Sequence, residues 1–461
     1  MPRVVIVGGG ISGLALAYRL EQRLPDAEVI VLEQRERLGG TIGTERHDGF
    51  QVEIGANGFL DNKPFALALC RELGLGERLL SASEAARRNR YLFLDGRLHL
   101  LPNSLTSFLT CDALSWRTRF LLLAERFRPR RLGGDESIDT FVRRRVGREL
   151  AETLADAFVT GIHAGDPKLL SVQAAFPRLV ELEREYGSVL RGMTASARRR
   201  RAEAAARGES SPTSARMWSF REGLSLLIDT LRERLRFAPL RGVHVRTVRR
   251  MANEGWRVQS DGRDGWDAEV VVLTCPAFQQ AVMLADEDTD LAMAIDGIPY
   301  NRVAVVALGY RAADVPGGLD GFGYLSPQRE RRDVLGVQWC SSIFSDRAPP
   351  GLVLLRAMCG GWNRPEMLDW NDERLLNAVR GELRCAMRIA APPVFHRVIR
   401  WRCAIPQYHL GHLERVAWIE HRLSRHPGLF LGGNAYRGVA LNDCIERASL
   451  IAEQAARHLH Q

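Results

Sequence analysis

The chain has 461 residues, 46% of them apolar, and a formal net charge of +9. This length and composition indicate a globular protein with two or three domains, and no apolar run reaches the roughly 18 residues that a membrane-spanning helix needs. The eight cysteines are scattered without metal-ligand spacing, so we expect reduced thiols and no metal site. The excess of arginine suits an anionic membrane face or an acidic ligand better than nucleic acid, because no nucleic-acid module accompanies it.

The first predicted element is a dinucleotide-binding βαβ unit. An apolar strand over residues 4–7 leads into the glycines Gly8, Gly10 and Gly13, a helix, and a second apolar strand that ends at Glu33. In such a unit the first glycine allows a tight turn, the second lets the backbone approach a pyrophosphate, and the third brings the helix close to the strand. We expect Glu33 to accept the ribose hydroxyls. Because the three glycines interrupt the apolar run and no cleavage site follows, we expect a cytoplasmic protein.

A second pair of glycines, Gly39 and Gly40, follows the acid at the end of the second strand. This continuation resembles the flavin-containing amine oxidase superfamily, in which such a pair brings another backbone segment against the cofactor phosphates. The resemblance favours FAD over NAD as the cofactor.

The next part of the chain predicts a short strand, a loop and a hairpin. Residues 49–60 alternate between apolar and polar types and then open into glycines around Asn57, as expected for a strand that leads to a ligand loop. Residues 87–98 predict a hairpin whose turn contains Asp95 and Gly96.

A helical pattern extends from about residue 101 to residue 189. The apolar residues of 116–127 alternate with arginines on the opposite face, and Ser137 is expected to cap the following helix. A basic amphipathic helix can lie on an anionic membrane or pack its apolar face on its own domain, and both outcomes are open at this point. Residues 191–216, which include the run Arg198–Arg201, lack apolar periodicity and predict a mobile linker or a frayed helix.

The remaining chain predicts a return to the cofactor domain and a second sheet. The alternating segments 303–310, 335–339 and 352–358 indicate an antiparallel platform, and residues 428–446 indicate a buried strand, a glycine turn and a helix. The domains are therefore discontinuous. We predict FAD-binding segments at 1–80, 215–290 and 405–461, substrate-domain segments at 81–100 and 291–404, and a helical, membrane-associating domain with its linker at 101–214.

Five segments carry a more specific resemblance. They are GANGFL at 55–60, GIHAGD at 161–166, GFGYL at 321–325, IPQYHLGH at 405–412 and GNAYRGV at 433–439. Together they resemble the oxygen-dependent, FAD-containing protoporphyrinogen oxidases over nearly the full length. The resemblance implies an α/β fold with a p-hydroxybenzoate-hydroxylase-like FAD-binding part, a mixed α/β substrate domain and a helical insertion that associates with a membrane surface.

The resemblance also implies site residues. Asn57 and Arg90 match catalytic positions, where Asn57 orients the substrate near the flavin and the planar fork of Arg90 pairs with a substrate propionate. The positions that match contacts with the macrocycle are Gly161, Phe322, Leu325 and Met358, and those that match FAD contacts are Gly8, Gly10, Gly13, Glu33, Gly39, Gly40, Val245, Gly433 and Val439. The chain departs from the family pattern in two ways: animal members carry arginine where Asn57 stands, and Gln338 replaces a usual apolar residue.

The activity implied by the resemblance is the six-electron oxidation of protoporphyrinogen IX to protoporphyrin IX in haem biosynthesis, with oxygen as the acceptor and hydrogen peroxide as the product. Because the flavin carries the redox chemistry, no acid/base pair is required, and His163, His409 and His412 are expected to be structural. A first alternative is the oxidation of coproporphyrinogen III, whose enzymes lack the arginine that matches Arg90. A second alternative is an amine oxidase or a carotenoid desaturase, for which an aromatic cage or a long apolar tunnel is expected. The partners are then the porphyrinogen, oxygen and a cytoplasmic membrane face, and a homodimer is left open.

Overall fold

A parallel sheet assembled from distant parts of the chain forms one half of the molecule. The computed structural model describes residues 1–102, 107, 114–131, 133–206, 215–252, 255–262 and 264–460. The four strands of this sheet lie in the order β19-β13-β1-β2, and all neighbouring pairs are parallel. Their bounds are β1 (Arg3–Val7), β2 (Glu28–Leu32), β13 (Val270–Leu273) and β19 (Leu429–Leu431). The βαβ unit predicted from the glycine motif is therefore confirmed, and it forms one side of this sheet.

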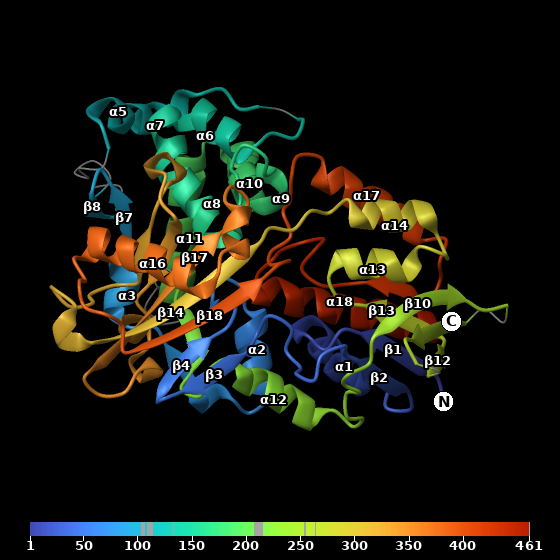
Figure 1. Ribbon diagram of the computed structural model, residues 1–461. Coiled ribbons are helices and arrows are strands. Elements are labelled where there is room, and N and C mark those ends of the chain that lie inside the picture. The colour runs from blue at the N-terminus through green and yellow to red at the C-terminus, as the bar shows by residue number, and fades with distance from the viewer. Residues whose placement is uncertain are drawn as a thin grey trace.

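Both faces of the parallel sheet are covered, as Figure 1 shows at the end of the molecule that carries the two termini. One face packs on α1 (Ile11–Arg23), α2 (Phe65–Glu72), α12 (Ser225–Arg234) and α18 (Leu441–Leu459). The other face packs on the antiparallel sheet of β10 (Val245–Arg250), β11 (Trp256–Ser260) and β12 (Gly265–Ala268), and on α13 (Ala277–Leu284), α14 (Thr289–Asp296) and α17 (His412–Leu423). Strands buried on both faces are expected to be continuous apolar runs, as these are.

A seven-stranded sheet, in the order β18-β14-β17-β16-β15-β7-β8, forms the other half. Its strands are β7 (Tyr91–Leu94), β8 (Arg97–Leu100), β14 (Val303–Arg311), β15 (Gly323–Leu325), β16 (Val334–Gln338), β17 (Leu352–Gly360) and β18 (Phe395–Trp401). All pairs are antiparallel except β15 with β7. The predicted hairpin and antiparallel platform are therefore confirmed. One face of this sheet packs on α16 (Asp372–Met387), which leaves the opposite face for other elements.

Short strands and helices connect the two halves. The β3 (Thr44–His47) and β4 (Phe50–Glu53) hairpin follows the second glycine pair, and β9 (Met217–Phe220) lies between β5 (Phe59–Leu60) and β6 (Leu79–Ser81). The short helices α3 (Glu84–Arg88) and α15 (Cys340–Ile343) pack on each other. The division into six domain segments stays a prediction.

The helical insertion is confirmed for its described residues. It consists of α5 (Trp116–Ala124), α6 (Ile138–Val146), α7 (Arg148–Leu150), α8 (Asp156–His163), α9 (Val172–Ala175), α10 (Pro177–Tyr186) and α11 (Val189–Ala206). Ser137 caps α6 as predicted, because its hydroxyl accepts a hydrogen bond from the Thr140 amide at 3.2 Å. Within the part of the chain that the structure describes, no helix is both long enough and apolar enough to cross a membrane.

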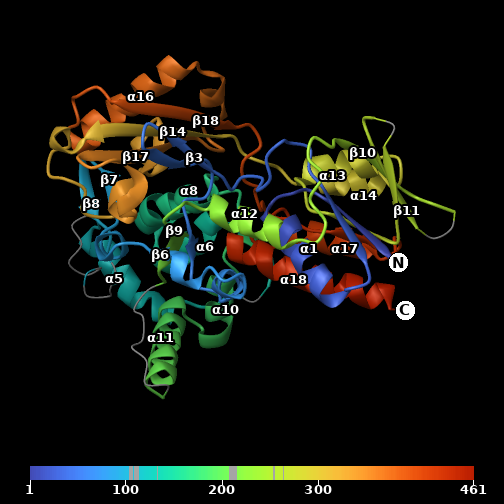
Figure 2. The ribbon, with the colours of Figure 1, turned by 90° about the horizontal axis from the view of Figure 1, so that it is seen from below.

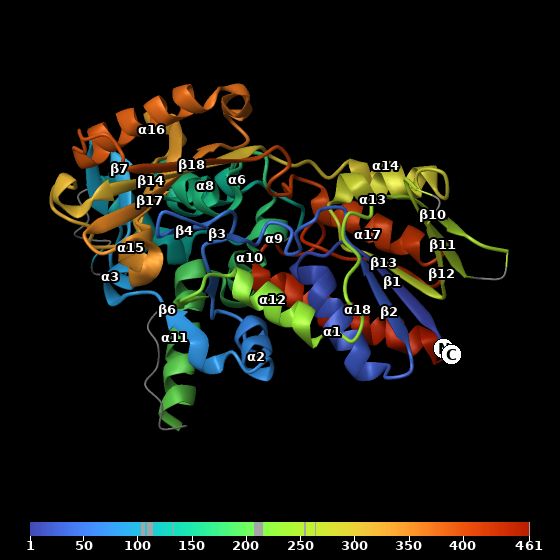
Figure 3. The same cartoon turned by 60° about the horizontal axis from the view of Figure 1, so that its bottom comes forward.

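Residues 191–216 are predicted to form either a mobile linker or a frayed helix, and the structure has a helix over residues 191–206. Residues 189–206 form α11, which extends away from the body of the molecule in Figures 2 and 3. The helix forms without apolar periodicity because alanine and arginine have high intrinsic helix propensity, and because Ser188 caps its start by accepting from the Arg191 amide at 3.1 Å. The glycine- and serine-containing stretch 208–212, also assigned to the linker, lies outside the described residues.

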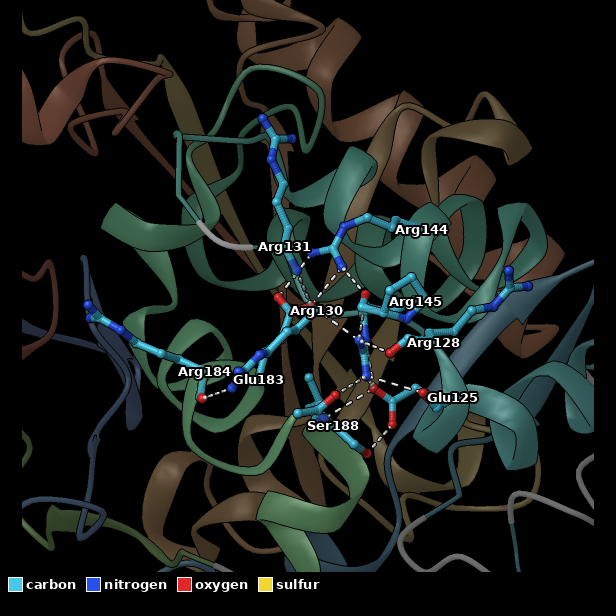
Figure 4. A network of polar contacts seen from close by, with 12 residues as sticks. Glu125, Arg128, Arg130, Arg131, Arg144, Arg145, Glu183, Arg184 and Ser188 are labelled. Atoms are coloured by element: carbon cyan, nitrogen blue, oxygen red, sulfur yellow. Dashed lines mark hydrogen bonds and ion pairs between the residues drawn. The ribbon is translucent and has the colours of Figure 1, made fainter.

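A buried ion network ties the insertion together (Figure 4). Arg145 and Glu125 are only 2% and 1% exposed and form an ion pair in which Arg145 Nε lies 2.7 Å from the Glu125 carboxylate. Glu183 accepts from Arg144 at 2.6 Å and from Arg145 at 3.1 Å. The Glu125 carboxylate also accepts from the Ser188 hydroxyl and from the Val189 amide. This carboxylate therefore neutralises a buried cation and caps the start of α11.

We expect the substitution Arg145→Met to destabilise the protein by about 3–5 kcal/mol, because it leaves Glu125 buried without its cation. The matched control is Arg148→Met, which removes a cation whose side chain is 78% exposed and which should change stability by less than about 1 kcal/mol. Urea unfolding followed by circular dichroism measures both changes. Equal effects of the two substitutions would contradict the role assigned to the buried pair.

Candidate functional site

A cavity of about 620 Å³ lies where the parallel strands end. It is lined by Val7 and Leu32 at the ends of β1 and β2, by Thr274 after β13 and by Gly433 after β19. Ligands of open α/β sheets bind at this carboxyl edge of the strands. Seven of the nine predicted FAD contacts line the cavity: Gly8, Gly10, Glu33, Gly39, Gly40, Val245 and Gly433.

The glycines of the first turn serve two different purposes. A Cβ atom on Gly13 would lie 1.9 Å from the Gly8 carbonyl oxygen, so Gly13 is required for the packing of α1 on the turn. Gly13 lies beneath the cavity and does not line it. A Cβ atom on Gly10 would meet only the Gly40 Cα atom, at 3.9 Å, and would otherwise extend into open space. Gly10 therefore leaves room for a ligand, as expected for a residue that contacts a pyrophosphate.

Glu33 is held in place by backbone donors at the mouth of the same cavity. Its carboxylate is 7% exposed and accepts from the Gly9 amide at 2.7 Å and from the Arg35 amide at 3.0 Å. Each carboxylate oxygen can accept further hydrogen bonds, so Glu33 remains suited to a ribose hydroxyl. The first residues of α1, Ile11 and Ser12, also line the cavity, and the helix N-terminus favours a phosphate there.

Sequence reasoning missed Arg37, which holds the second glycine loop in shape. Its guanidinium donates to the carbonyl oxygens of Leu38 at 2.9 Å and of Ile42 and Gly40 at 2.5 Å. Three carbonyl acceptors on one guanidinium keep Gly39 and Gly40 beside the first turn. The position of this arginine between Glu33 and the glycine pair was the available signal in the sequence.

The opposite end of the cavity is formed by residues from other parts of the chain. Trp401, at the end of β18, donates from Nε1 to the Ile54 carbonyl at 2.8 Å, and both residues line the cavity together with Tyr300 and Asn434. Nothing local in the sequence identified Trp401, because β18 reaches the cavity only through tertiary packing. The predicted FAD contact Val439 does not line the cavity. It packs on the helical cluster around Tyr408, and its contact with FAD stays a prediction.

Three of the predicted substrate contacts form one apolar wall on the seven-stranded sheet. Leu325 and Met358 both pair in register with Gly336, so they lie in one row across β15, β16 and β17. They point away from α16, because the alternate residues Tyr324 and Ala357 belong to the α16 core. A Cβ atom on Gly161 would lie 3.0 Å from both methyl groups of Leu325, so α8 approaches this row closely at its glycine.

Arg90 and Phe322 lie together at the starts of the parallel strands β7 and β15. The Arg90 guanidinium carbon lies 5.0 Å from the centre of the Phe322 ring. The Phe322 amide donates to the Asn89 carbonyl at 2.8 Å, which fixes the two segments against each other. Among the described residues, no carboxylate pairs with the Arg90 side chain. A cation over an aromatic face without a carboxylate partner is available to an anionic ligand.

The loop that carries Asn57 is joined to this wall by Arg356. The guanidinium of Arg356 donates to the Gly55 carbonyl and to the Gln338 side chain, the latter at 2.9 Å. Arg356 is 3% exposed, and burial lowers the pKa of its guanidinium. Arg356 and Met358 share one face of β17. The polar residue Gln338, unusual at its position, therefore provides an acceptor for a buried arginine, and Asn57 Nδ2 is buried with no hydrogen-bond partner among the described residues.

The three histidines singled out from the sequence are all largely removed from solvent. Burial lowers the pKa values of His163 and His412 to about 4 and also lowers the pKa of His409. His412 Nε2 lies 2.9 Å from the Tyr436 carbonyl oxygen, which only a protonated ring nitrogen can satisfy, so His412 donates there. None of the three lines the cavity at the sheet edge. Neutral histidines of this kind support the packing of the insertion on the rest of the chain.

We expect Gly10→Ala and Gly13→Ala to separate ligand binding from folding. Gly10→Ala should change the stability of the apoprotein by at most about 1 kcal/mol but weaken FAD binding at least tenfold, because its Cβ atom enters the cavity. Gly13→Ala should destabilise the apoprotein by about 1–3 kcal/mol or more, because its Cβ atom collides with the Gly8 carbonyl. Thermal unfolding of the apoprotein and titration with FAD measure the two effects. Unchanged FAD affinity in Gly10→Ala would contradict the placement of the phosphates.

The residues of the cavity fit FAD. Glu33 and Val245 can hold the adenosine, the two glycine loops and the start of α1 can hold the diphosphate, and Ile54, Trp401 and Gly433 leave room for the ring system.

Comparison with known proteins also indicates a flavin cofactor. The family model described as flavin containing amine oxidoreductase matches residues 11–456.

Two proteins similar in sequence and one similar solved structure indicate the branch of this family to which the chain belongs. Protoporphyrinogen oxidase 1 of Arabidopsis thaliana chloroplasts is 34% identical over 96% of this chain and 86% of its own length. Coproporphyrinogen III oxidase of Bacillus subtilis is 28% identical over 99% of this chain and 98% of its own length. A crystal structure from an Exiguobacterium species, provisionally assigned as a protoporphyrinogen oxidase, has a TM-score of 0.84 at 27% identity and covers 100% of this chain and 99% of that one. Because the family model and the Arabidopsis relative both span nearly the whole chain, the chain belongs to the flavin-containing amine oxidoreductase family and, within it, to the FAD-dependent protoporphyrinogen oxidases.

Proposed function

We propose that this protein oxidises protoporphyrinogen IX to protoporphyrin IX. The reaction removes six electrons and six protons from the substrate in three two-electron steps and reduces three molecules of oxygen to three of hydrogen peroxide. FAD, when bound, supplies the hydride acceptor and passes the electrons to oxygen. The observation that supports the proposal best is the unpaired Arg90 guanidinium beside the apolar wall of Gly161, Leu325 and Met358.

The chain's own residues bind and orient the substrate. The flat wall can accept an apolar macrocycle, the close approach of α8 at Gly161 leaves the wall without a protruding side chain, and Arg90 can pair with a propionate at its edge. Arg356 links this wall to Gly55, next to Ile54, which lines the FAD cavity. Asn57 follows in the same loop and can orient the substrate through its unpartnered amide. These contacts support a substrate position between the wall and the flavin end of the cavity.

The second candidate reaction is the oxidation of coproporphyrinogen III, and it is favoured by the full-length similarity to the Bacillus subtilis enzyme. The two substrates differ in the number of propionates, four against two. Among the residues that the structure describes, Arg90 is the arginine beside the wall without a hydrogen-bonded partner, and one such cation suits the substrate with fewer carboxylates. We therefore prefer protoporphyrinogen IX.

We expect Arg90→Ala to lower kcat/KM for protoporphyrinogen IX about 10- to 100-fold, mainly through KM, because a charge-assisted hydrogen bond contributes about 1.5–3 kcal/mol. Fluorescence of the porphyrin formed under air measures the rate, with protoporphyrinogen IX and coproporphyrinogen III compared at equal concentration. The matched control is Arg88→Ala, whose side chain is 69% exposed. Preference of the wild type for coproporphyrinogen III would move the protein to the second reaction, and no turnover of either substrate would refute both.

We also propose that the helical insertion binds an anionic membrane surface. Trp116, Phe120, Leu123 and Phe127 follow a helical period along α5 and the turn after it, and they are 75%, 66%, 54% and 72% exposed. These four apolar residues thus point outward, whereas Leu122 of the same helix is buried in the insertion. Exposed arginines at 117, 126, 128 and 130 accompany it. Apolar residues framed by cations are typical of helices that lie in a membrane interface.

A peripheral location on the cytoplasmic face and a homodimer stay predictions.

We expect the wild type to sediment with vesicles of phosphatidylcholine that contain phosphatidylglycerol, and much less with vesicles of phosphatidylcholine alone. The double substitution Phe120→Ala and Phe127→Ala should lower the bound fraction at least tenfold, because each ring contributes about 1.5–3 kcal/mol when buried. The matched control is Met293→Ala on α14, which removes an apolar side chain that is 62% exposed on a different surface. Equal losses in both variants would contradict the proposal.

A further inference from the structure

A second cavity, of about 330 Å³, lies between α8, the connection from β15 to β16 and the segment after β17. The residues that line it include Thr160 of α8, Ala164 directly after α8, Ser326 and Arg331 of the connection, and Trp362 after β17. None of the residues predicted to contact FAD or the porphyrinogen belongs to its lining. The cavity is therefore separate from the site described above, although Gly161 and Leu325 neighbour it in sequence.

The cavity lining is rich in hydrogen-bond donors, and it contains no aspartate or glutamate among the residues that the structure describes. Three arginines line the cavity: Arg331, Arg332 and Arg364. Arg332 donates to Glu382 at 2.9 Å, and Arg364 pairs with Asp333 at 2.9 Å and with Glu366 at 2.6 Å. Among the residues that the structure describes, Arg331 has no carboxylate partner. Arg331 is exposed and thus places a cation without a carboxylate partner at the open side of the cavity lining.

Two buried polar atoms beside Arg331 also have no partner within the described part of the chain. Ser326 is 5% exposed, and its hydroxyl makes no hydrogen bond; the side-chain nitrogen of Gln328 is likewise buried and unpartnered. Most buried polar groups in native proteins are hydrogen-bonded, so such atoms point to a missing acceptor. The backbone amide of Gln328 donates to the Asp156 carboxylate at 2.6 Å, and this bond fixes the main chain that carries the unpartnered side chain. Arg331 itself has φ of +51°, a conformation that most non-glycine residues avoid.

The rest of the lining is apolar. Pro327, Val334, Leu335 and the ring of Trp362 face the same space. A site that combines a guanidinium, a hydroxyl and an amide donor with apolar walls fits an anion on a short hydrocarbon body better than a bare inorganic ion. We propose that this cavity is a second ligand site, which binds a small organic carboxylate through Arg331, Ser326 and Gln328.

The experiment is a titration of the FAD-loaded protein with sodium valerate at constant ionic strength, followed by calorimetry and by thermal unfolding. We expect saturable binding and a raised unfolding temperature with valerate, and neither with sodium chloride or 1-pentanol. Arg331→Gln and Ser326→Ala should each weaken valerate binding at least tenfold, because each removes a donor to the carboxylate. Two separate single substitutions keep the test decisive if one of them perturbs the fold.

Two control variants test whether valerate binds at this cavity. Arg329→Gln changes a neighbouring arginine that does not line the cavity, and Arg90→Ala changes the cation of the porphyrinogen wall; both should retain valerate binding. Absence of saturable binding, or binding that survives Arg331→Gln and Ser326→Ala, would overturn the proposal. Inorganic phosphate that binds more tightly than valerate would overturn the carboxylate assignment. Because binding is measured without turnover, these outcomes are independent of the proposed oxidation.

Discussion

The close contact between α1 and the first glycine turn is the constraint on which the rest of the cofactor site depends. Gly13 lies against the Gly8 carbonyl so tightly that a single added carbon would collide with it. This contact fixes the start of α1 at the carboxyl edge of the parallel sheet, where its amide groups and positive end of the dipole face the cavity. The Gly9 amide is then in place to donate to Glu33, and the Gly9 carbonyl accepts from Gly39 at 2.8 Å. One steric requirement thus arranges both glycine loops and the ribose acid.

Two hydrogen bonds join the half of the molecule that contains the FAD cavity to the seven-stranded sheet of the other half. Trp401 at the end of β18 donates to Ile54, and Arg356 in β17 donates to Gly55. Burial of the cation of Arg356 carries a desolvation cost, which is offset only if its hydrogen bonds are well made. The nearby Glu53 and Arg347 are also fully buried, 3.8 Å apart, and burial raises the pKa of Glu53. This polar cluster holds the Gly55–Asn57 loop against the apolar wall. The loop therefore connects the wall to the flavin end of the cavity, which Ile54 lines.

The helical insertion buries an ion network beside a small apolar cluster and exposes several large aromatic side chains. Its centre contains the pair of Arg145 and Glu125 and the additional carboxylate of Glu183, whereas Trp116 and Phe127 are exposed. In a protein surrounded only by water, the opposite distribution is favoured, because exposed aromatic side chains lose the stabilisation of burial. A fold that keeps ion pairs inside and aromatic rings outside is suited to a surface that can take up the rings. The ion network keeps the helices ordered without using those rings as a core.

The sequence alone determined the parts of this protein that depend on local chemistry. The glycine spacing and Glu33 defined the βαβ unit, Asp95 and Gly96 defined the hairpin, and Ser137 defined a helix start, because each of these features is set by residues close together in the chain. Tertiary structure alone decided which face of α5 points outward, that Trp401 lines the cavity, and that Gln338 pairs with Arg356. It also decided that Glu125, far away in sequence, accepts hydrogen bonds from Ser188 and Val189 at the start of α11. These features arise from contacts between distant segments, and a local pattern carries no information about which distant segment will be the partner.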